Sequence, residues 1–330
     1  MTERDRLLNA IATTIADYRS GEIPKPDAAH VDRWIKQFPA QVQQPILAEM
    51  EHVLARTYLT KANVETFITK LVTSPNPDLT GTNPCAFWGA AHFLNIQGGG
   101  NSQRDMLALF STTLSAQCGI TIAQCGAPSS STFIYLDDVV FTGNRVLKDL
   151  TSWINSAAPP TAHVHVITIG LHSGGQHYAQ GKIAAAATAA NKTISIKWWR
   201  AVELEDRKTY IDSSDVLRPT VIPNDPATQA YVQGFKYAPV LRKPGNVGGK
   251  ALFSSEAGRH LLEQEYLQRG VHIRSICPHL GVYQRPLGNM VLETTGFGSM
   301  LVTFRNCPNN APLVLWAGNP WYPLFPRKTN

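Results

Sequence analysis

The chain has little cysteine and no long apolar run. Its five cysteines contain no Cys-x-x-Cys pair, and their number is odd. This pattern excludes a disulfide-rich miniprotein and predicts free thiols in a reducing compartment. No window approaches the roughly 18 unbroken apolar residues of a membrane span. The first residues lack the apolar stretch of a signal peptide, so we expect a soluble, cytoplasmic protein that does not contact the membrane.

Several common catalytic motifs are also absent. The sequence has no Gly-x-Ser-x-Gly, no His-Glu-x-x-His and no P-loop signature. Serine hydrolase, zincin and P-loop NTPase functions therefore have no support. With 43% hydrophobic and 16% charged residues, the composition excludes disorder and coiled coils. The net charge of +6 permits anionic ligands such as phosphates or nucleic acid without requiring them.

The first quarter of the chain has the period of amphipathic helices. Apolar residues recur three and four positions apart in the runs 31–38, 42–54 and 64–72. Thr60 is a plausible N-cap of the third run. The polar segment 74–83 is rich in Pro, Gly and Asn and ends the set. We expect a helical cap over residues 1–76.

The middle of the chain alternates strand and helix patterns. Short apolar runs predict strands at 93–97, 133–136, 164–169 and 194–199. Helical periodicity follows three of them, around 106–110, 146–154 and 178–190. This order predicts a Rossmann-like parallel α/β sheet over 77–200, in which ligands bind at the carboxyl ends of strands. Residues 201–285 are expected to form an insertion or lid, and 286–330 a C-terminal hood.

The segment after the second predicted strand carries most of the chemical information. Asp137 and Asp138 are adjacent carboxylates, which repel each other and need partners such as sugar hydroxyls or a divalent ion. The next helix is opened by Phe141, Thr142, Gly143, Asn144 and Arg145. Gly143 permits a close turn, and amides at a helix start form an anion site. The segment thus offers acceptors for a ribose diol and donors for a phosphate. The structural alternatives are that Asp138 only caps the helix and Gly143 only permits the turn.

A glycine-rich loop follows the first predicted strand. It consists of Gly98, Gly99, Gly100, Asn101 and Ser102, with Gln103 after it. Its backbone amides, with the Ser102 hydroxyl and Arg104, could hold a diphosphate. A flexible glycine-rich turn is an equally open alternative, because a lone glycine run is a weak signal.

Histidines and C-terminal aromatic residues are weaker candidates. His163 and His165 alternate on a strand, but zinc needs three or four ligands, so structural histidines are favoured. His172 stands out because it comes just after the predicted strand 164–169. Four aromatic residues near amides and a guanidinium could stack on a base or on single-stranded nucleic acid, namely Phe297, Trp316, Trp321 and Phe325. A packed aromatic core is the alternative.

The segment 133–145, FIYLDDVVFTGNR, resembles the phosphoribosyl-diphosphate (PRPP) motif of type I phosphoribosyltransferases. The shared pattern is four apolar residues, two acids, two apolar residues and a Thr-Gly turn. The resemblance implies that Asp137 and Asp138 bind the ribose 2′ and 3′ hydroxyls and that 141–145 binds the 5′-phosphate. It also implies a pyrophosphate loop at 98–102 and Mg²⁺, bound through the substrate diphosphate and Asp137 and Asp138. The chain departs from the motif at Phe141, where Thr or Ser is typical, and at Arg145, where a small residue is usual.

Further blocks between residues 30 and 327 are similar to the PRTase-CE family of bacterial conflict systems. They read HVDRWIKQF, FLNIQGGGNSQ, DDVVFTGNRV, GFGSMLVTFRNCPNN and WYPLFPR. The similarity implies a sheet of the type I phosphoribosyltransferase kind and an anti-phage effector, encoded beside a retron or another defence module. Such an effector would act on PRPP, a nucleotide or a nucleoside at ribose C1′, as a phosphoribosyl- or glycosyltransferase or an N-glycosidase. The alternative is a non-catalytic subunit that binds nucleotides or nucleic acid, or that assembles with a defence protein partner.

Overall fold

The computed structural model describes residues 1–328, and the chain divides into two compact units. Unit 1 consists of Met1–Lys61 and Leu204–Asn330, and unit 2 consists of Ala62–Glu203. Unit 2 is therefore an insertion in the sequence of unit 1. The cap, lid and hood roles expected for 1–76, 201–285 and 286–330 stay predictions.

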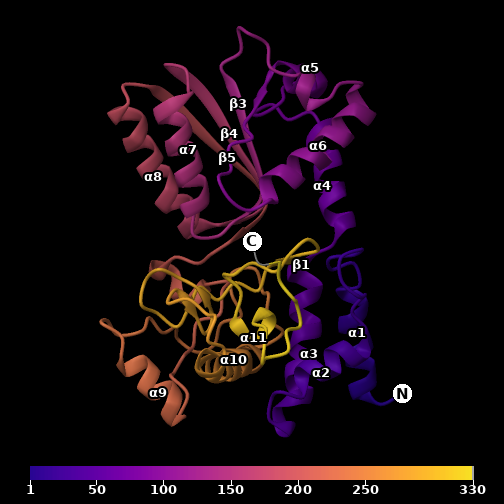
Figure 1. Ribbon diagram of the computed structural model, residues 1–330, viewed down its shortest axis with the longest axis vertical. Coiled ribbons are helices and arrows are strands. Elements are labelled where there is room, and N and C mark those ends of the chain that lie inside the picture. The colour runs from indigo at the N-terminus through magenta and orange to yellow at the C-terminus, as the bar shows by residue number, and fades with distance from the viewer. Residues whose placement is uncertain (329–330) are drawn as a thin grey trace. The chain divides into compact units, whose positions relative to one another are not determined.

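Unit 2 contains a parallel four-stranded sheet (Figure 1). Its strands, in order across the sheet, are β2 (His92–Phe93), β3 (Thr132–Val140), β4 (Thr161–His172) and β5 (Thr193–Leu204). β3 pairs in parallel with β2 on one side and with β4 on the other, so it is a central strand. The predicted Rossmann-like α/β sheet is confirmed.

Helices connect the strands and cover the sheet. The helices of unit 2 are α4 (Lys61–Thr73), α5 (Pro84–Ala90), α6 (Ser102–Cys118), α7 (Asn144–Ser156) and α8 (Ser173–Ala189). α7 and α8 lie side by side and bury Leu150 and Ile183 in one core with Tyr135 and Val166 of the sheet. α6 contributes nothing to that core and lies on the other side of β3, where its Phe110 packs on Trp88 and Phe93 (Figure 1).

Several predicted boundaries in unit 2 were wrong. β3 does not end at residue 136 but continues through both acids to Val140, because β4 continues beside it. β2 pairs only over two residues, because the N–H groups of Ile96 and Gln97 bind the Gln103 side chain and not a neighbouring strand. β5 extends to Leu204, and α8 begins at Ser173 despite two glycines in its first turn.

The regular elements of unit 1 are mainly helices joined by long irregular segments, and its N-terminal and C-terminal segments pack together. Its helices are α1 (Glu3–Thr14), α2 (Ala28–Ile35), α3 (Ala40–Thr57), α9 (Pro226–Gln233), α10 (Glu256–Ile276) and α11 (Leu313–Trp316). The strand β1 (Tyr58–Leu59) pairs in parallel with β8 (Val302–Thr303), and β6 (Gln284–Arg285) pairs antiparallel with β7 (Gly288–Asn289). The indoles of Trp34 and Trp321 both donate hydrogen bonds to the carbonyl of Val314.

The C-terminal aromatic residues belong to this core. All four candidates for base stacking are buried: Phe297, Trp316, Trp321 and Phe325. The structure therefore favours the packed aromatic core over a stacking surface.

The expectation of five free thiols was wrong. Cys85 of α5 and Cys118 at the end of α6 form a disulfide, with their Cα atoms 5.5 Å apart. Only Cys125, Cys277 and Cys307 are free thiols. The bonded cysteines are separated by 33 positions, and they meet because α5 packs beside the C-terminal end of α6, a contact that spacing cannot reveal.

Across the described residues 1–328, no helix combines the length and apolarity needed to cross a membrane.

Candidate functional site

The paired carboxylates lie near the carboxyl end of the central strand β3. Asp137 is buried and Asp138 is partly exposed. The N–H of Asp138 donates to Asp137 Oδ1 at 2.9 Å, and the N–H of Val139 donates to Asp138 Oδ1 at 2.7 Å. Each carboxylate is thus oriented by the following backbone amide. Carboxylate oxygens are hydrogen-bond acceptors, so the pair can accept hydrogen bonds from hydroxyl groups of a ligand.

The turn after β3 is held by a close backbone contact. Gly143 has a φ of +75°, and a Cβ there would lie 2.2 Å from the carbonyl oxygen of Gly175. A Cβ at Gly175 would in turn lie 1.9 Å from the carbonyl oxygen of Phe141. Only glycine fits both positions, because any side chain would clash with the opposing backbone. The turn therefore rests directly on the first residues of α8.

His172 also supports this turn. Its Nδ1 donates to the carbonyl of Val140 at 3.0 Å, and its ring stacks on Phe141 with centroids 5.0 Å apart. Burial lowers the pKa of His172 to about 4. The ring is therefore neutral at pH 7 and acts as a packing and hydrogen-bonding partner of the turn.

The turn leads into the N-terminus of α7. The N-cap of this helix is Gly143, which has no side chain with which to cap the first turn. The Thr142 hydroxyl is nearby and accepts only a long 3.5 Å bond from the Asn144 N–H. Uncapped amides at a helix start, with the helix dipole behind them, attract anions. The segment predicted to bind a phosphate therefore lies at a helix N-terminus.

Two glutamines hold the glycine-rich loop, and one of them, Gln97, also bonds to Asp137. Gln103 is fully buried, and its Oε1 accepts hydrogen bonds from the N–H groups of Ile96 and Gln97. The Gln97 amide donates to Ser102 Oγ at 3.1 Å and to Asp137 Oδ2 at 3.2 Å. These bonds hold both ends of the loop, so they argue against an unconstrained glycine turn.

Arg145 connects the turn with the loop. A Cβ on Gly99 would lie 3.5 Å from Arg145 Nη2, which places the guanidinium against the loop. Arg145 Nη1 also lies 4.0 Å from Oδ1 of Asp149, one turn along α7. Burial raises the pKa of the Asp149 carboxyl, although its Oδ2 accepts a 2.8 Å hydrogen bond from the Tyr135 hydroxyl.

The structure brings the predicted site residues into one part of unit 2. The acids at 137–138, the turn 141–145 and the loop 98–102 are linked by Gln97 and Arg145. Sequence reasoning missed the positioning roles of Gln97, Gln103 and Gly175. The one signal in the sequence for Gly175 is the glycine pair that follows β4.

The remaining histidine candidates have structural contacts. His165 Nδ1 accepts a hydrogen bond from the Trp199 indole at 2.9 Å, and His163 bonds to the Ser195 hydroxyl. Residues 1–328 contain no group of three or more His, Cys, Asp or Glu side chains that could hold a metal ion. Protein side chains alone therefore do not form a closed metal site there. A cation could be shared between the two aspartates and a bound substrate.

Comparison with known proteins identifies the family. No curated protein and no solved structure matches the chain. The PRTase-CE family model matches residues 31–327, which is most of the sequence and includes segments of both units. The chain therefore belongs to the PRTase-CE family and is a phosphoribosyltransferase-like protein.

Proposed function

We propose that unit 2 binds a phosphoribosyl ligand, either PRPP or a nucleotide, at the carboxyl end of β3. The observation that carries this proposal is the gathering of three complementary groups. Carboxylates at 137–138 suit the ribose diol, the uncapped start of α7 suits the 5′-phosphate, and the loop 98–102 suits a diphosphate. Sites at this edge of a parallel sheet are the usual ligand sites of such folds.

The chemistry proposed is substitution at ribose C1′. Loss of the group at C1′ creates a positively charged, oxocarbenium-like centre, which nearby carboxylates stabilise. Asp137 and Asp138 would hold the ribose hydroxyls, and donors in the loop 98–102 would stabilise the negative charge of a leaving pyrophosphate. The reaction is a phosphoribosyl or glycosyl transfer or an N-glycoside hydrolysis.

Magnesium would bind at this site together with the substrate. Mg²⁺ is typically held by one or two carboxylates together with substrate phosphates and water, and residues 137 and 138 supply such a pair of carboxylates. Asp137 and Asp138 are the residues that would contact it. When bound, the ion would neutralise charge on the diphosphate.

A non-catalytic nucleotide-binding subunit is the second candidate. It is favoured by Phe141, whose ring stacks on His172 at a position where the motif normally has a hydroxyl. Losing that hydroxyl removes one phosphate contact while leaving the backbone amides in place. Binding without turnover would suit a sensor that signals to a partner protein.

Calorimetry and turnover measurements on the full chain separate these functions. PRPP with Mg²⁺ is titrated into the protein, and ³¹P NMR then follows release of pyrophosphate, alone and with each nucleobase. Binding with turnover supports the enzyme, and binding without turnover supports the sensor. Absence of binding to both PRPP and ribose 5-phosphate contradicts the proposed site.

We further propose that the protein serves anti-phage defence in the cytoplasm, with a retron component or another defence protein as partner. This rests on the resemblance of its sequence blocks to conflict-system proteins. Phage plating on cells that carry the wild-type or Asp138→Asn gene tests the defence role, and affinity purification tests the partner. The Cys85–Cys118 disulfide counts against a reducing cytosol, where such bonds are rare. Alkylation of thiols in protein taken directly from cells tests whether this bond is formed there.

A further inference from the structure

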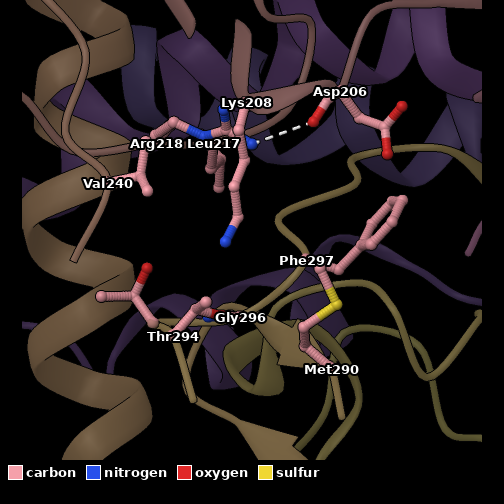
Figure 2. Close-up of a pocket in the computed structure, with 10 residues that line it drawn as sticks. Asp206, Lys208, Leu217, Arg218, Val240, Met290, Thr294, Gly296 and Phe297 are labelled. Atoms are coloured by element: carbon pink, nitrogen blue, oxygen red, sulfur yellow. Dashed lines mark hydrogen bonds between the residues drawn. The ribbon is translucent and has the colours of Figure 1, made fainter. Parts of the chain in front are cut away.

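Unit 1 contains a small pocket that leaves no room for a regulatory ligand. Its free volume is about 30 Å³, roughly the space of one water molecule, and Lys208 points into it (Figure 2). The Phe297 ring on its wall is 4% exposed and therefore belongs to the core of the unit. A small organic molecule therefore does not regulate the protein from this pocket.

The Cys85–Cys118 disulfide encloses one half of the proposed ligand site in unit 2. The bond joins α5 to the end of α6 and closes a loop of 33 positions. This closed segment, residues 85–118, contains β2, the glycine-rich loop 98–102 and both glutamines that hold the loop. The acids at 137–138 and the turn 141–145 lie outside it. The bond therefore constrains the part of the site expected to bind a diphosphate, but not the part expected to bind ribose 5-phosphate.

The closed segment is paired with the sheet over a short length. β2 lies at the edge of the sheet and pairs with β3 over two residues, and the Leu94 N–H adds one bond to the carbonyl of Ile134 at 2.9 Å. The contacts of Phe110 with Trp88 and Phe93 are internal to the segment. A segment held in this way opens more readily than the central strands. A cross-link lowers the entropy of the opened chain, so the disulfide keeps the segment closed.

The bond is accessible to a reductant. Both cysteines are partly exposed, and their neighbours Ala86 and Gln117 are exposed. The remaining cysteine of unit 2, Cys125, is a poor attacking group, because burial raises the pKa of its thiol and only the thiolate attacks a disulfide. Exchange within unit 2 is therefore slow, and cleavage of the bond requires a thiol reductant from outside the protein.

From this placement we propose that the Cys85–Cys118 pair is a redox switch for binding of a ligand that carries a diphosphate, a proposal that rests on the function proposed for unit 2. A dithiol supplies two electrons and two protons: its own thiols become a disulfide, the bond between Cys85 and Cys118 breaks, and both cysteines become thiols. The reduced segment opens more often, which separates Gln97 from Asp137 and the loop 98–102 from the carboxylates. In a reducing cytosol, where disulfides are usually transient, the oxidised protein is the binding form and the reduced protein is the weakly binding form.

Calorimetry on full-length protein, oxidised or reduced with dithiothreitol, tests the switch. Reduction should weaken binding of PRPP with Mg²⁺ about fivefold or more, as expected when at most about a fifth of the reduced molecules hold the segment closed. Ribose 5-phosphate lacks the diphosphate, so its affinity should be nearly unchanged by reduction. The Cys85→Ser, Cys118→Ser variant should match reduced wild type with both ligands, whether or not dithiothreitol is present. Cys125→Ser should retain the full response, because that thiol is free.

Amide hydrogen exchange provides a readout that does not depend on the ligand. Reduction should accelerate exchange at the amides of 85–118 and leave those of α7 and α8 unchanged. Equal exchange in both redox states overturns the switch, whether or not PRPP binds. Equal PRPP affinities of the oxidised and the reduced protein also overturn it, while the proposed ligand site stands. Binding of neither ligand by the oxidised protein would instead reject the function proposed for unit 2, and faster exchange on reduction would then still support redox control of the segment.

Discussion

The side-chain amide of Gln97 donates a hydrogen bond to Asp137 Oδ2 at 3.2 Å, across 40 positions of sequence. The same nitrogen lies 3.1 Å from the Ser102 hydroxyl, so one side chain contacts both the carboxylate pair and the glycine-rich loop. Gln97 thereby fixes the separation between the carboxylate pair and the loop, where the ribose and the diphosphate of the proposed ligand would bind. Preorganisation of this kind lowers the entropic cost of binding.

Replacing Asp138 by Asn should weaken PRPP binding at least tenfold without unfolding the protein. Asp138 is partly exposed, and the amide oxygen of Asn can still accept the bond from the Val139 N–H. The lost charge removes a strong acceptor for a ribose hydroxyl, worth about 1.5–3 kcal/mol. Calorimetry and thermal unfolding measure the two effects. Asp78→Asn, which neutralises an exposed acid in a loop of unit 2, is the control. Equal affinities of these two variants would mean that the pair is not the diol site.

Replacing Arg145 by Ala should weaken ribose 5-phosphate binding by about 1.5–3 kcal/mol, a tenfold to hundredfold loss. Its side chain is 49% exposed and its Nη1 lies 4.0 Å from Oδ1 of the buried Asp149, so the ion pair is loose and leaves half of the arginine side chain accessible to a ligand. Lys148→Ala, an exposed lysine on the same helix, should have little effect. Unchanged affinity with a lower melting temperature would instead make Arg145 a structural partner of Asp149.

Gly143→Ala should lower the free energy of unfolding by more than about 2 kcal/mol, because it combines a strained positive φ with a backbone clash. Gly181, within α8, has open space around its Cβ position. Gly181→Ala should therefore stabilise the protein by about 0.5–1 kcal/mol through helix propensity. Denaturant unfolding of both variants measures whether the first substitution destabilises the protein and the second stabilises it. A neutral Gly143→Ala would show that the turn is not pressed against Gly175.

Breaking the Cys85–Cys118 disulfide should reduce stability by about 3–4 kcal/mol, as expected for a loop of 33 positions in the chain-entropy model. Unfolding of the Cys85→Ser, Cys118→Ser variant against wild type measures the loss. Cys125→Ser removes a free thiol of the same unit and serves as the control. Rapid alkylation of Cys85 in native, unreduced protein would contradict the bond.

Stability should fall as the solution is acidified from pH 7.5 to pH 5. Burial lowers the pKa of both His165 and His172 to about 4, whereas an unfolded histidine titrates near 6.5. The folded state therefore favours the neutral rings. Their contribution to the free energy of unfolding is complete above pH 6.5 and decreases as the pH falls towards 4. Each ring should account for about 2 kcal/mol at pH 5.

Comparison of wild type with a His172 variant separates the loss of stability caused by this histidine from the loss caused by the carboxylates. His172→Asn keeps a donor for the Val140 carbonyl but cannot titrate. Chemical denaturation at both pH values should show a smaller loss for this variant than for wild type. Identical losses of stability in the variant and in wild type would mean that His172 does not cause the pH dependence.

Local patterns predicted the sheet and the place of the acids well, because both depend on short apolar runs such as 133–136 and 164–169. The patterns failed where a side chain, and not a neighbouring strand, bonds the backbone amides. The predicted strand 93–97 is cut short because Gln103 takes the amides of Ile96 and Gln97, which no periodicity reveals. The strand of Asp137 was predicted too short because acids are typical of turns.

Contacts between distant segments were beyond such reasoning. The Gly143–Gly175 approach, the Cys85–Cys118 bond and the hydrogen bond from Trp34 to Val314 each join residues far apart in sequence. Single residues in one sequence do not indicate which distant partner they meet. The sequence indicated the segments of the proposed site, 98–102, 137–138 and 141–145, but not the glutamines that join them.

The insertion of unit 2 within unit 1 sets the order in which the two can fold on the ribosome. Every residue of unit 2 emerges before Leu204, so its core around Tyr135 and Leu150 can form while translation continues. The first helices of unit 1 cannot pack fully until later, because Trp34 bonds to the carbonyl of Val314, which is synthesised near the end of the chain. During synthesis the segment whose apolar faces stay exposed longest is thus α1–α3 and not unit 2.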